Sequence, residues 1–440
     1  MMAQMTQQYF NEDIDLFTEI LEREMTPALG CTDPAGIAFA AAYARQHIKG
    51  RLLEVRSEIS VNVIKNAAAV CIPRTGGRHG VRLALALGAI AGNAENGLEV
   101  FRDLMPEDTE QAQSMIDREA VSFSVAAAPE TLYIKVTVTT TEGSASAVIR
   151  GSYTNVAGLI VNGKSIPLKT EAESAEKPKL PYDRLSLAAI LSYAETVPID
   201  RLGIIEKAIS MNMAIAEEGF VKNYGMCAGR NIKKYVENGR MGRGLASTAM
   251  MCVASATDAR MAGCDMPVIS NTGSGNQGLA STVPVVSIAR MLDAPHEAMV
   301  RAVAVSSLVT IYIKRKLGAL SAVCGAVIAG AGTGCGAVYL LGGDREQMLA
   351  ALNSTLGDVA GMICDGAKAG CSMKVATCTN TGIVSALMAM DQKGIEGSDG
   401  IVDSDETITI DNFIKIATEG MGNMDHVILD IILKKEGAAS

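Results

Sequence analysis

The chain has 440 residues and a formal net charge of −9, it contains no tryptophan, and only 4% of its residues are aromatic. This length predicts two domains, and an acidic composition argues against a nucleic-acid binder, which would show a basic face. The ten cysteines follow a polar N-terminus without the apolar core of a signal peptide. They therefore predict reduced thiols in a cytoplasmic protein rather than disulfides.

Residues 1–166 predict a smaller α+β module. Apolar residues at helical spacing favour a helix over 11–25, and Asp33 followed by a proline predicts the cap and first residue of the next helix. Alternating apolar residues predict a strand over 53–64. Further helices are expected over 81–93 and 106–119, and further strands over 121–125, 132–140, 144–153 and 158–161. Residues 167–182, which are rich in proline, lysine and glutamate, predict a linker.

Residues 183–440 predict a larger all-α catalytic domain. Helices are expected over 185–196, 201–218, 232–238, 242–262, 282–292, 295–309 and 345–360, with others after residue 382. The run 317–343 carries no charge and exceeds the ~20 residues that span a bilayer. Its many glycines and alanines make it only weakly apolar, so we interpret it as a tightly packed internal segment and expect no membrane contact.

Three cysteines in this half predict a metal site. Cys324, Cys364 and Cys371 have the spacing C-x39-C-x6-C, whereas zinc sites usually show paired C-x2-C motifs or a nearby histidine. Three thiolates with an open fourth position suit an iron–sulfur cluster that acts as a Lewis acid. The alternative is that all three are buried apolar side chains, which is our interpretation of Cys335 and Cys378.

A glycine-rich segment before a predicted helix is the second candidate site. Its residues are small or carry amide donors, so their N–H groups could converge on a substrate carboxylate: Ser270, Asn271, Thr272, Gly273, Ser274, Gly275, Asn276 and Gln277. The segment lacks the GK[ST] ending of a phosphate-binding loop. A plain glycine-rich turn is the alternative interpretation.

Other single residues are weaker candidates. Cys31 lies just ahead of a predicted helix N-terminus, which would favour its thiolate, although a small buried residue in a turn is equally compatible. Arg74, Arg78 and His79 could clamp an anion or simply face solvent. Lys374 is a candidate acid or base only because it follows Cys371 closely, and we interpret 314–316 as a solvated helix end.

These motifs resemble the bacterial and archaeal L-cysteine desulfidases, which are related to the α-subunit of iron–sulfur L-serine dehydratases. The resemblance covers most of the chain between residues 27 and 374. It rests on the stretches PALGCTDP (27–34), ASATDARMAG (254–263), SNTGSGNQG (270–278), IYI (311–313), LSAVC (320–324) and GMICDGAKAGCSMK (361–374).

The resemblance implies a [4Fe–4S] cluster on Cys324, Cys364 and Cys371, no pyridoxal phosphate, and Cys31 as the suspected base or substrate-site thiol. Two departures stand out. Similar proteins usually carry glutamate where Asp33 stands, and their loop with the pattern Pro-Gly-Thr-Gly is here PRTGGRHG (73–80). The added arginines and histidine suggest either a substrate with an extra anionic group or a contact with another subunit.

We therefore expect an iron–sulfur lyase that converts L-cysteine into sulfide, pyruvate and ammonia. The rivals are an L-serine dehydratase, a lyase for another β-substituted amino acid, and a non-catalytic cluster-bearing sensor of small amino acids. A pyridoxal-phosphate lyase would do the same chemistry, yet no lysine has a distinctive cofactor context. The expected partner is a small amino acid, with no nucleic acid and no membrane, and a homo-oligomer remains open.

Overall fold

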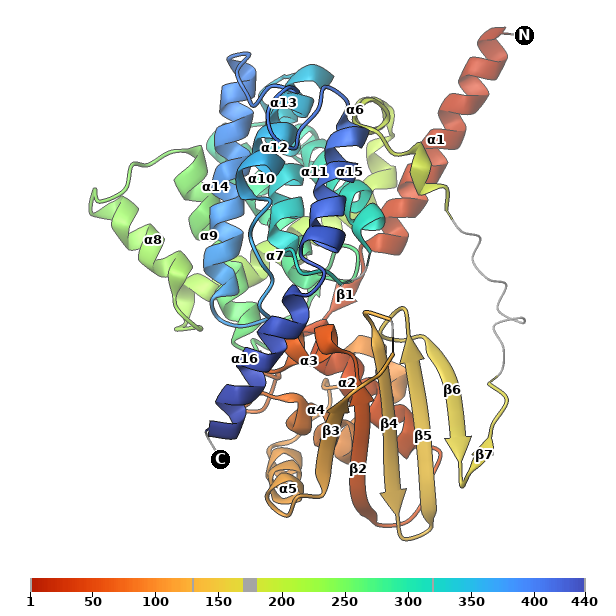
Figure 1. The fold of residues 1–440 in the computed structure, drawn as a ribbon. Helices are drawn as coiled ribbons and strands as arrows, with labels where there is room; N and C mark the ends of the chain where they lie inside the picture. Colours follow the sequence, from red (N-terminus) through yellow and green to blue (C-terminus); the bar gives the residue numbers. More distant parts are fainter. Residues whose placement is uncertain (1, 129, 169–179, 319, 439–440) are drawn as a thin grey trace.

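The computed structural model describes residues 2–128, 130–168, 180–318 and 320–438. A sheet with helices on one face forms the smaller unit, and a bundle of helices forms the larger one (Figure 1). The predicted α+β class, with a smaller sheet region before a larger helical region, is confirmed. The candidate site lies where the two units meet, so the packing between them matters most for function.

The smaller unit is built on a six-stranded sheet of order β3-β2-β4-β5-β6-β7. The strands are β2 (Leu52–Ile59), β3 (Val121–Val125), β4 (Tyr133–Thr140), β5 (Gly143–Arg150), β6 (Val156–Val161) and β7 (Lys164–Ser165). Only β2 and β3 pair in parallel. The strand predicted over 53–64 is wrong at its end, because the chain turns at Ser60 into helix α3.

Helices cover one face of this sheet. Helices α2 (Thr32–Arg45) and α4 (Val81–Ala91) pack on this face, α5 (Pro106–Asp117) packs on α4, and α3 (Val61–Ala67) lies beyond the end of the strands, beside α2 (Figure 1). Val55 and Val136 point inward and are fully buried, while Glu58 and Lys135 form an ion pair on the opposite, exposed face. This alternation is the period-two pattern of a strand with one buried face. It places the core of the smaller unit between the sheet and α2.

The larger unit is helical almost throughout. Its helices are α6 (Leu187–Thr196), α7 (Gly203–Val221), α8 (Ala228–Glu237), α9 (Leu245–Met261), α10 (Gly275–Met291), α11 (His296–Leu317), α12 (Gly325–Leu340), α13 (Arg345–Val359), α14 (Cys371–Met390) and α15 (Glu406–Lys415). Short helical turns lie at Ala94–Glu99, Tyr182–Arg184, Ile199–Leu202 and Ile416–Gly420. Within the weakly apolar run at 317–343, residues Gly325–Leu340 form α12, which is buried nearly all round, as a packed core helix should be.

Glycines allow the central helices to approach very closely. A Cβ built on Gly330 of α12 would lie 2.6 Å from the carbonyl oxygen of Cys378 in α14. A Cβ on Gly382 of α14 would lie 2.2 Å from the carbonyl oxygen of Gly330. Side chains at either position would force the helices apart. The high glycine content therefore fixes the spacing of α12 and α14, whose first turns carry two of the cysteines.

The packing differs from the predicted domain division at both ends of the chain. Helix α1 (Met2–Glu24) buries Phe17 and Leu21 in the core of the helical unit, although it precedes the sheet in sequence. Helix α16 (Met424–Ala438) runs down beside α3 and buries Leu429 in the core of the sheet unit (Figure 1). In addition, β1 (Pro27–Ala28) pairs with β8 (Val268–Ile269), a strand that was not predicted. Most of the predicted linker lies outside the described residues.

One described helix, α11, is long and apolar enough by length and composition to cross a membrane. However, 72% of its apolar window is buried inside the fold. Its side chains pack against α10 and α12 and belong to the main core of the helical unit. Within this structure α11 is a core helix.

Candidate active site

A cavity of about 110 Å³ lies between the two units, well above the roughly 10–15 Å³ that one water needs. The sheet unit lines it with Cys31, Thr32, Asp33 and Asn66, and the helical unit lines it with the other residues. These are Arg260, Ser274, Gly275, Asn276, Gln277, Cys324, Gly325, Ala326, Cys364, Gly366, Ala367, Cys371 and Val375. All four cysteines singled out from the sequence therefore face one space, although 340 positions separate the first from the last.

Four helices begin at this cavity. Helices α2, α10, α12 and α14 start at Thr32, Gly275, Gly325 and Cys371, and each of these first residues lines the cavity. Of the four preceding residues, only Ser274 caps its helix with a side chain, by accepting a hydrogen bond from the Gln277 N–H. First-turn N–H groups without helical partners and the helix dipoles make such ends attractive to anions. Four together favour negative charge in the cavity.

Cys324 and Cys364 are brought side by side by a short backbone pairing. The N–H of Cys324 donates to the Met362 carbonyl at 2.9 Å, and the N–H of Cys364 donates to the Ala322 carbonyl at 2.7 Å. Cys371 arrives as the first residue of α14. Between the last two cysteines, Gly366 has φ +93°, and a Cβ there would meet the Lys65 carbonyl of α3 at 2.3 Å. Only glycine fits that turn.

The three thiols form a donor set for a group larger than one ion. Among the described residues, no three His, Cys, Asp or Glu side chains converge closely enough to hold a single metal ion. Burial raises the pKa of Cys324 to about 12, and the neighbouring Cys364 and Cys371 add to this shift. Thiolates at this site therefore need compensating positive charge. The cavity, its helix N-termini and the soft sulfur donors fit a polynuclear iron–sulfur group held by these three cysteines.

The environment of Cys31 contradicts the prediction of a favoured thiolate. Cys31 is itself the N-cap of α2, and Asp33 lies in the first turn instead of capping the helix. The Sγ atom is buried and donates to Asp33 Oδ2 at 3.5 Å. Burial raises the pKa of Cys31 far above its usual value, and the charge of Asp33 raises it further. The helix N-terminus does not outweigh desolvation, so the resting form is the thiol.

Asp33 is the centre of a buried hydrogen-bond network that the sequence interpretation missed. Its Oδ1 accepts from Asn66 Nδ2 at 3.1 Å and from the hydroxyl of Tyr153, which follows β5. Burial raises the pKa of Asp33, although these hydrogen bonds partly oppose the shift. The only sequence signal for this role was the position of Asp33 two residues after Cys31. Asn66 and Tyr153 come from elements that only the fold brings together.

Arg260 was also missed, although it lies in the quoted stretch ASATDARMAG. The side chain is buried, and it links the two units: Nη2 donates to the Gly30 carbonyl at 2.6 Å and Nη1 to Asn276 Oδ1 at 2.9 Å. Its Nε has no hydrogen-bond partner in the described structure. The available signal was a charged side chain in a helix made mostly of small or apolar residues, where Asp258 is the only other charge, because buried charges usually serve a partner or ligand.

The predicted anion-binding segment divides into two halves. Ser274, Gly275, Asn276 and Gln277 line the cavity. The first half instead fixes the segment to the end of α1 and to α11: the N–H groups of Ser270 and Thr272 donate to the carbonyls of Thr26 and Glu24, and Asn271 Nδ2 donates to the Ser307 carbonyl. Ser270, Asn271, Thr272 and Gly273 therefore do not line the cavity, and the prediction that they bind substrate is not supported.

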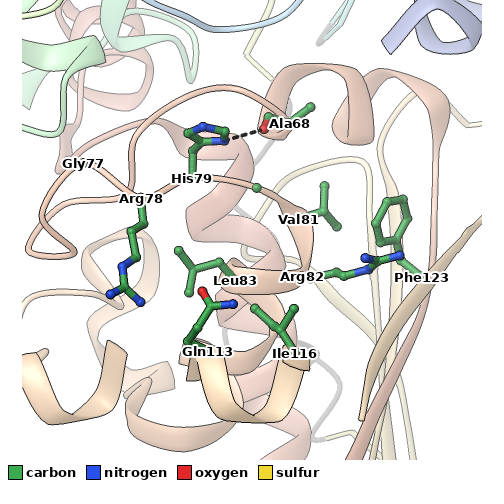
Figure 2. Close-up of a pocket in the computed structure, with 11 residues that line it drawn as sticks. Ala68, Gly77, Arg78, His79, Val81, Arg82, Leu83, Gln113, Ile116 and Phe123 are labelled. Atoms are coloured by element: carbon green, nitrogen blue, oxygen red, sulfur yellow. Dashed lines mark hydrogen bonds between the residues drawn. The ribbon is translucent and has the colours of Figure 1, made fainter. Parts of the chain in front are cut away.

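The arginine- and histidine-rich loop also lies outside the cavity, which corrects the prediction of a substrate clamp. Arg74 pairs with Asp265 at 2.7 Å and Arg78 with Glu110 at 2.8 Å, while His79 Nδ1 lies 3.2 Å from the Ala68 carbonyl. Arg78 and His79 line a separate pocket of about 530 Å³ beside α4 and α5. Figure 2 shows Arg78 on one side of this pocket, with His79 turned toward Ala68.

Neither lysine prediction agrees with the structure. The Lys374 ammonium donates to the Ile363 carbonyl at 2.7 Å and pairs with Asp365, and Lys374 does not line the cavity. Its assignment as acid or base is therefore not supported. Lys314 is buried rather than solvated. Burial lowers its pKa to about 8, against the opposing effect of Cys364, Cys324 and Asp33. The end of α11 thus adds a cation near the cavity wall.

Comparisons with known proteins agree on one family. Residues 95–430 match the family described as "Serine dehydratase alpha chain". A relative from Oleidesulfovibrio alaskensis, named "UPF0597 protein", is 40% identical over 96% of this chain and 98% of its own length. A relative with the same name from Shewanella pealeana is 40% identical over 96% of this chain and 98% of its own length. Another from Clostridium perfringens is 37% identical over 96% of this chain and 99% of its own length.

Proposed function

This chain belongs to the serine dehydratase alpha chain family, and from that premise we propose that it is an iron–sulfur-dependent lyase acting on L-cysteine. The reaction is a β-elimination. It releases sulfide and leaves an aminoacrylate, which tautomerises and hydrolyses to pyruvate and ammonia. The family supports a lyase of the iron–sulfur dehydratase type, and the choice of L-cysteine rests on the sequence resemblance described above.

One observation carries the proposal: Cys324, Cys364 and Cys371 share a single cavity with Cys31. The first three thiolates would hold a [4Fe–4S] cluster, and Cys31 remains free to act on the substrate. When bound, such a cluster supplies a Lewis-acidic iron that polarises the substrate. The positive ends of four helices and the guanidinium of Arg260 favour the negative charge of both the cluster thiolates and a carboxylate substrate.

Cys31 and Asp33 supply the proton transfers. Cys31 Sγ gives its proton to Asp33 Oδ2, 3.5 Å away, and the resulting thiolate removes the proton on Cα of the substrate. The protonated Asp33 then gives its proton to the departing sulfur. The pair begins and ends as thiol and carboxylate, so the protons balance over one turnover. Asn66 and Tyr153 hold the Asp33 carboxylate in place throughout.

L-serine is the second candidate substrate, because the matching family is described as a serine dehydratase chain. The same residues would then expel hydroxide in place of sulfide. A substrate with an additional anionic group loses its original support, since Arg74, Arg78 and His79 lie outside the cavity. The two candidates differ only in the leaving group, and product analysis separates them.

The test is anaerobic reconstitution with iron and sulfide, followed by iron and acid-labile sulfide analysis and by assays with L-cysteine and L-serine. We expect about four irons per chain, sulfide and pyruvate from L-cysteine, and little pyruvate from L-serine. Cys364→Ser should lose iron. Cys227→Ser, a change at another half-exposed cysteine that lines a different pocket, should retain it.

Cys31→Ala should keep its iron and lose turnover, because Cys31 acts on the substrate and does not hold the cluster. Pyruvate formation from L-serine alone would replace the proposal with a dehydratase. Iron and stoichiometric amino-acid binding without turnover would indicate a sensor. Failure of the wild-type chain to take up iron would overturn the proposal.

A further inference from the structure

Arg260 carries a buried positive charge for which the described residues provide no ion-pair partner. Arg260 is only 3% exposed. Its two hydrogen bonds go to neutral acceptors, the Gly30 carbonyl and the Asn276 amide oxygen. Burial lowers the pKa of Arg260, and the charge of Asp33 opposes this shift. However, the Asp33 oxygens already accept hydrogen bonds from Asn66, Tyr153 and Cys31. Buried guanidinium groups normally face an anion.

The first turn of α10 lies directly on this guanidinium. A Cβ built on Gly275 would come within 2.4 Å of Arg260 Nε, so only glycine lets the backbone approach this closely. The first N–H groups of a helix have no partner within the helix. The N-terminus of α10 and Arg260 therefore add their positive potentials at one wall of the cavity.

Gln277 provides an independent sign of a missing ligand. Its side chain lines the same wall and is only 2% exposed, and its Nε2 donor has no partner in the described structure. An unsatisfied buried donor is costly, and native proteins rarely keep one without a ligand or a bound water. Arg260 and Gln277 thus place a buried cation and a free N–H donor side by side around the start of α10.

We propose that Arg260, Gln277 and the N-terminus of α10 form the subsite that binds the α-carboxylate of the substrate. A carboxylate is planar and presents two acceptor oxygens, which suits a guanidinium and adjacent N–H donors. Cys31 and Asp33 line the same cavity, and Arg260 donates to the carbonyl of Gly30, the residue before Cys31, so a carboxylate held there brings the Cα of the substrate close to the base. The substrates are thus small α-amino acids with a free carboxylate. This inference rests on the proposed function.

The subsite is tested with a ligand that cannot react. L-alanine carries the carboxylate but has no leaving group, and L-alaninamide lacks only the carboxylate charge. Both are titrated by calorimetry into the anaerobically reconstituted chain. We expect L-alanine to bind at least about tenfold more tightly than L-alaninamide, since a hydrogen bond to a charged group stabilises a complex more than one to a neutral group.

Three variants locate the effect. Arg260→Lys keeps the charge but loses the planar fork, and it should weaken L-alanine binding about ten- to hundredfold. Gln277→Glu is nearly isosteric and puts a carboxylate into the subsite, so it should also abolish the preference for L-alanine over L-alaninamide. Gln277→Met, which removes the donor without adding charge, should have a smaller effect. Iron content and circular dichroism establish that each variant is folded.

The outcomes separate this inference from the proposed function. Equal binding of L-alanine and L-alaninamide by the wild-type chain would overturn the subsite, as would no binding of L-alanine at all. Unchanged L-alanine affinity in Gln277→Glu would overturn it even where Arg260→Lys failed to fold. If binding depends on Arg260 but neither L-cysteine nor L-serine is turned over, the subsite stands and the proposed reaction fails. If Arg260→Lys turns over substrate with an unchanged KM, the proposed reaction stands and the carboxylate subsite fails.

Discussion

The thiol of Cys31 donates to Asp33 Oδ2 across 3.5 Å inside a buried network that also includes Asn66 and Tyr153. Cys31 and Asp33 lie at the start of α2, whereas Tyr153 reaches them from the segment after β5. Because burial raises the pKa of both Cys31 and Asp33, their surroundings favour the protonated form of each group.

Asp33→Asn should raise the thermal stability of the cluster-free chain at pH 7. The pKa of Asp33 is higher in the folded chain than in the unfolded chain, where it is about 3.9. As the pH rises, the unfolded chain therefore loses this proton first. The free energy of unfolding falls as the pH rises from the unfolded pKa through the folded pKa. At neutral pH the burial of this carboxyl group is thus a cost that the variant removes. The advantage should shrink as the pH is lowered toward 4, which thermal unfolding curves across this range will measure.

The exposed Asp430→Asn is the control for that comparison, and it should show no comparable gain. A lower midpoint for Asp33→Asn at pH 7 would mean that Tyr153 and Asn66 stabilise the anion more than burial destabilises it. The same variant should lose most of its turnover, because an amide cannot accept the Cys31 proton. Gained stability with lost activity is the expected signature of a functional carboxylate.

Gly330→Ala should destabilise the chain by roughly 1–3 kcal/mol through overpacking. The new methyl would lie 2.6 Å from the Cys378 carbonyl, which is backbone and cannot rotate away. Since α12 and α14 carry Cys324 and Cys371 at their first turns, their separation should also lower the iron content after reconstitution. Denaturant unfolding and iron analysis measure the two effects.

Gly203→Ala is the matched control for that change. A Cβ on Gly203, at the start of α7, meets nothing within 4 Å, so alanine there should be neutral or slightly stabilising. Equal stabilities of the two variants would show that the contact between α12 and α14 is not as close as described.

Asp425→Ala should cost about 3 kcal/mol of unfolding free energy. Lys65 of α3 is 1% exposed and pairs with Asp425 of α16 at 2.5 Å, and Asn62 donates to the same carboxylate at 2.6 Å. Removing one partner of a buried pair leaves an uncompensated charge. The C-terminal helix should then detach from α3 and become sensitive to limited proteolysis. The exposed Asp430→Ala on the same helix should do neither, and equal protection of α16 in both variants would count against this role of Asp425.

Arg74→Ala and Arg78→Ala should change kcat/KM for L-cysteine by less than about twofold and stability by less than about 1 kcal/mol. Both arginines form half-exposed ion pairs, which are worth little, and neither lines the cysteine cavity. Steady-state assays and unfolding curves are sufficient here. A tenfold loss of kcat/KM would show that the loop reaches the substrate in a conformation different from this one.

Several features of the site were accessible from local sequence. Helix starts and turns depend on neighbouring residues, so short stretches of sequence can reveal them. This applies to the spacing of Cys324, Cys364 and Cys371, to the glycine-rich segment ahead of α10 and to the position of Cys31 ahead of α2. The elements of the sheet unit followed from period-two alternation. The end of β2 could not be placed in this way, since Val61 and Val63 continue the alternation although the chain turns into α3.

Features that depend on burial were predicted wrongly or missed. The helix N-terminus suggested a thiolate at Cys31, but desolvation dominates and its size depends on the surrounding fold. Lys314 was taken as part of a solvated helix end, and Arg74, Arg78 and His79 as either an anion clamp or solvent-facing charges, since charge in a sequence does not reveal which way a side chain points. The roles of Arg260, Asn66 and Tyr153 arise only from contacts between distant elements.

The sequence by itself thus determined the donor chemistry: three thiols in glycine-rich surroundings, a fourth at a helix start, and an amide-rich turn before α10. Only the tertiary structure decided which of these groups meet. Three long-range contacts bring these groups to one cavity. They are the pairing of residues 322–324 with 362–364, the glycine contacts between α12 and α14, and the docking of α2 and α3 against the helical unit. Periodicity reports local conformation, whereas convergence depends on long-range packing and desolvation that no short stretch encodes.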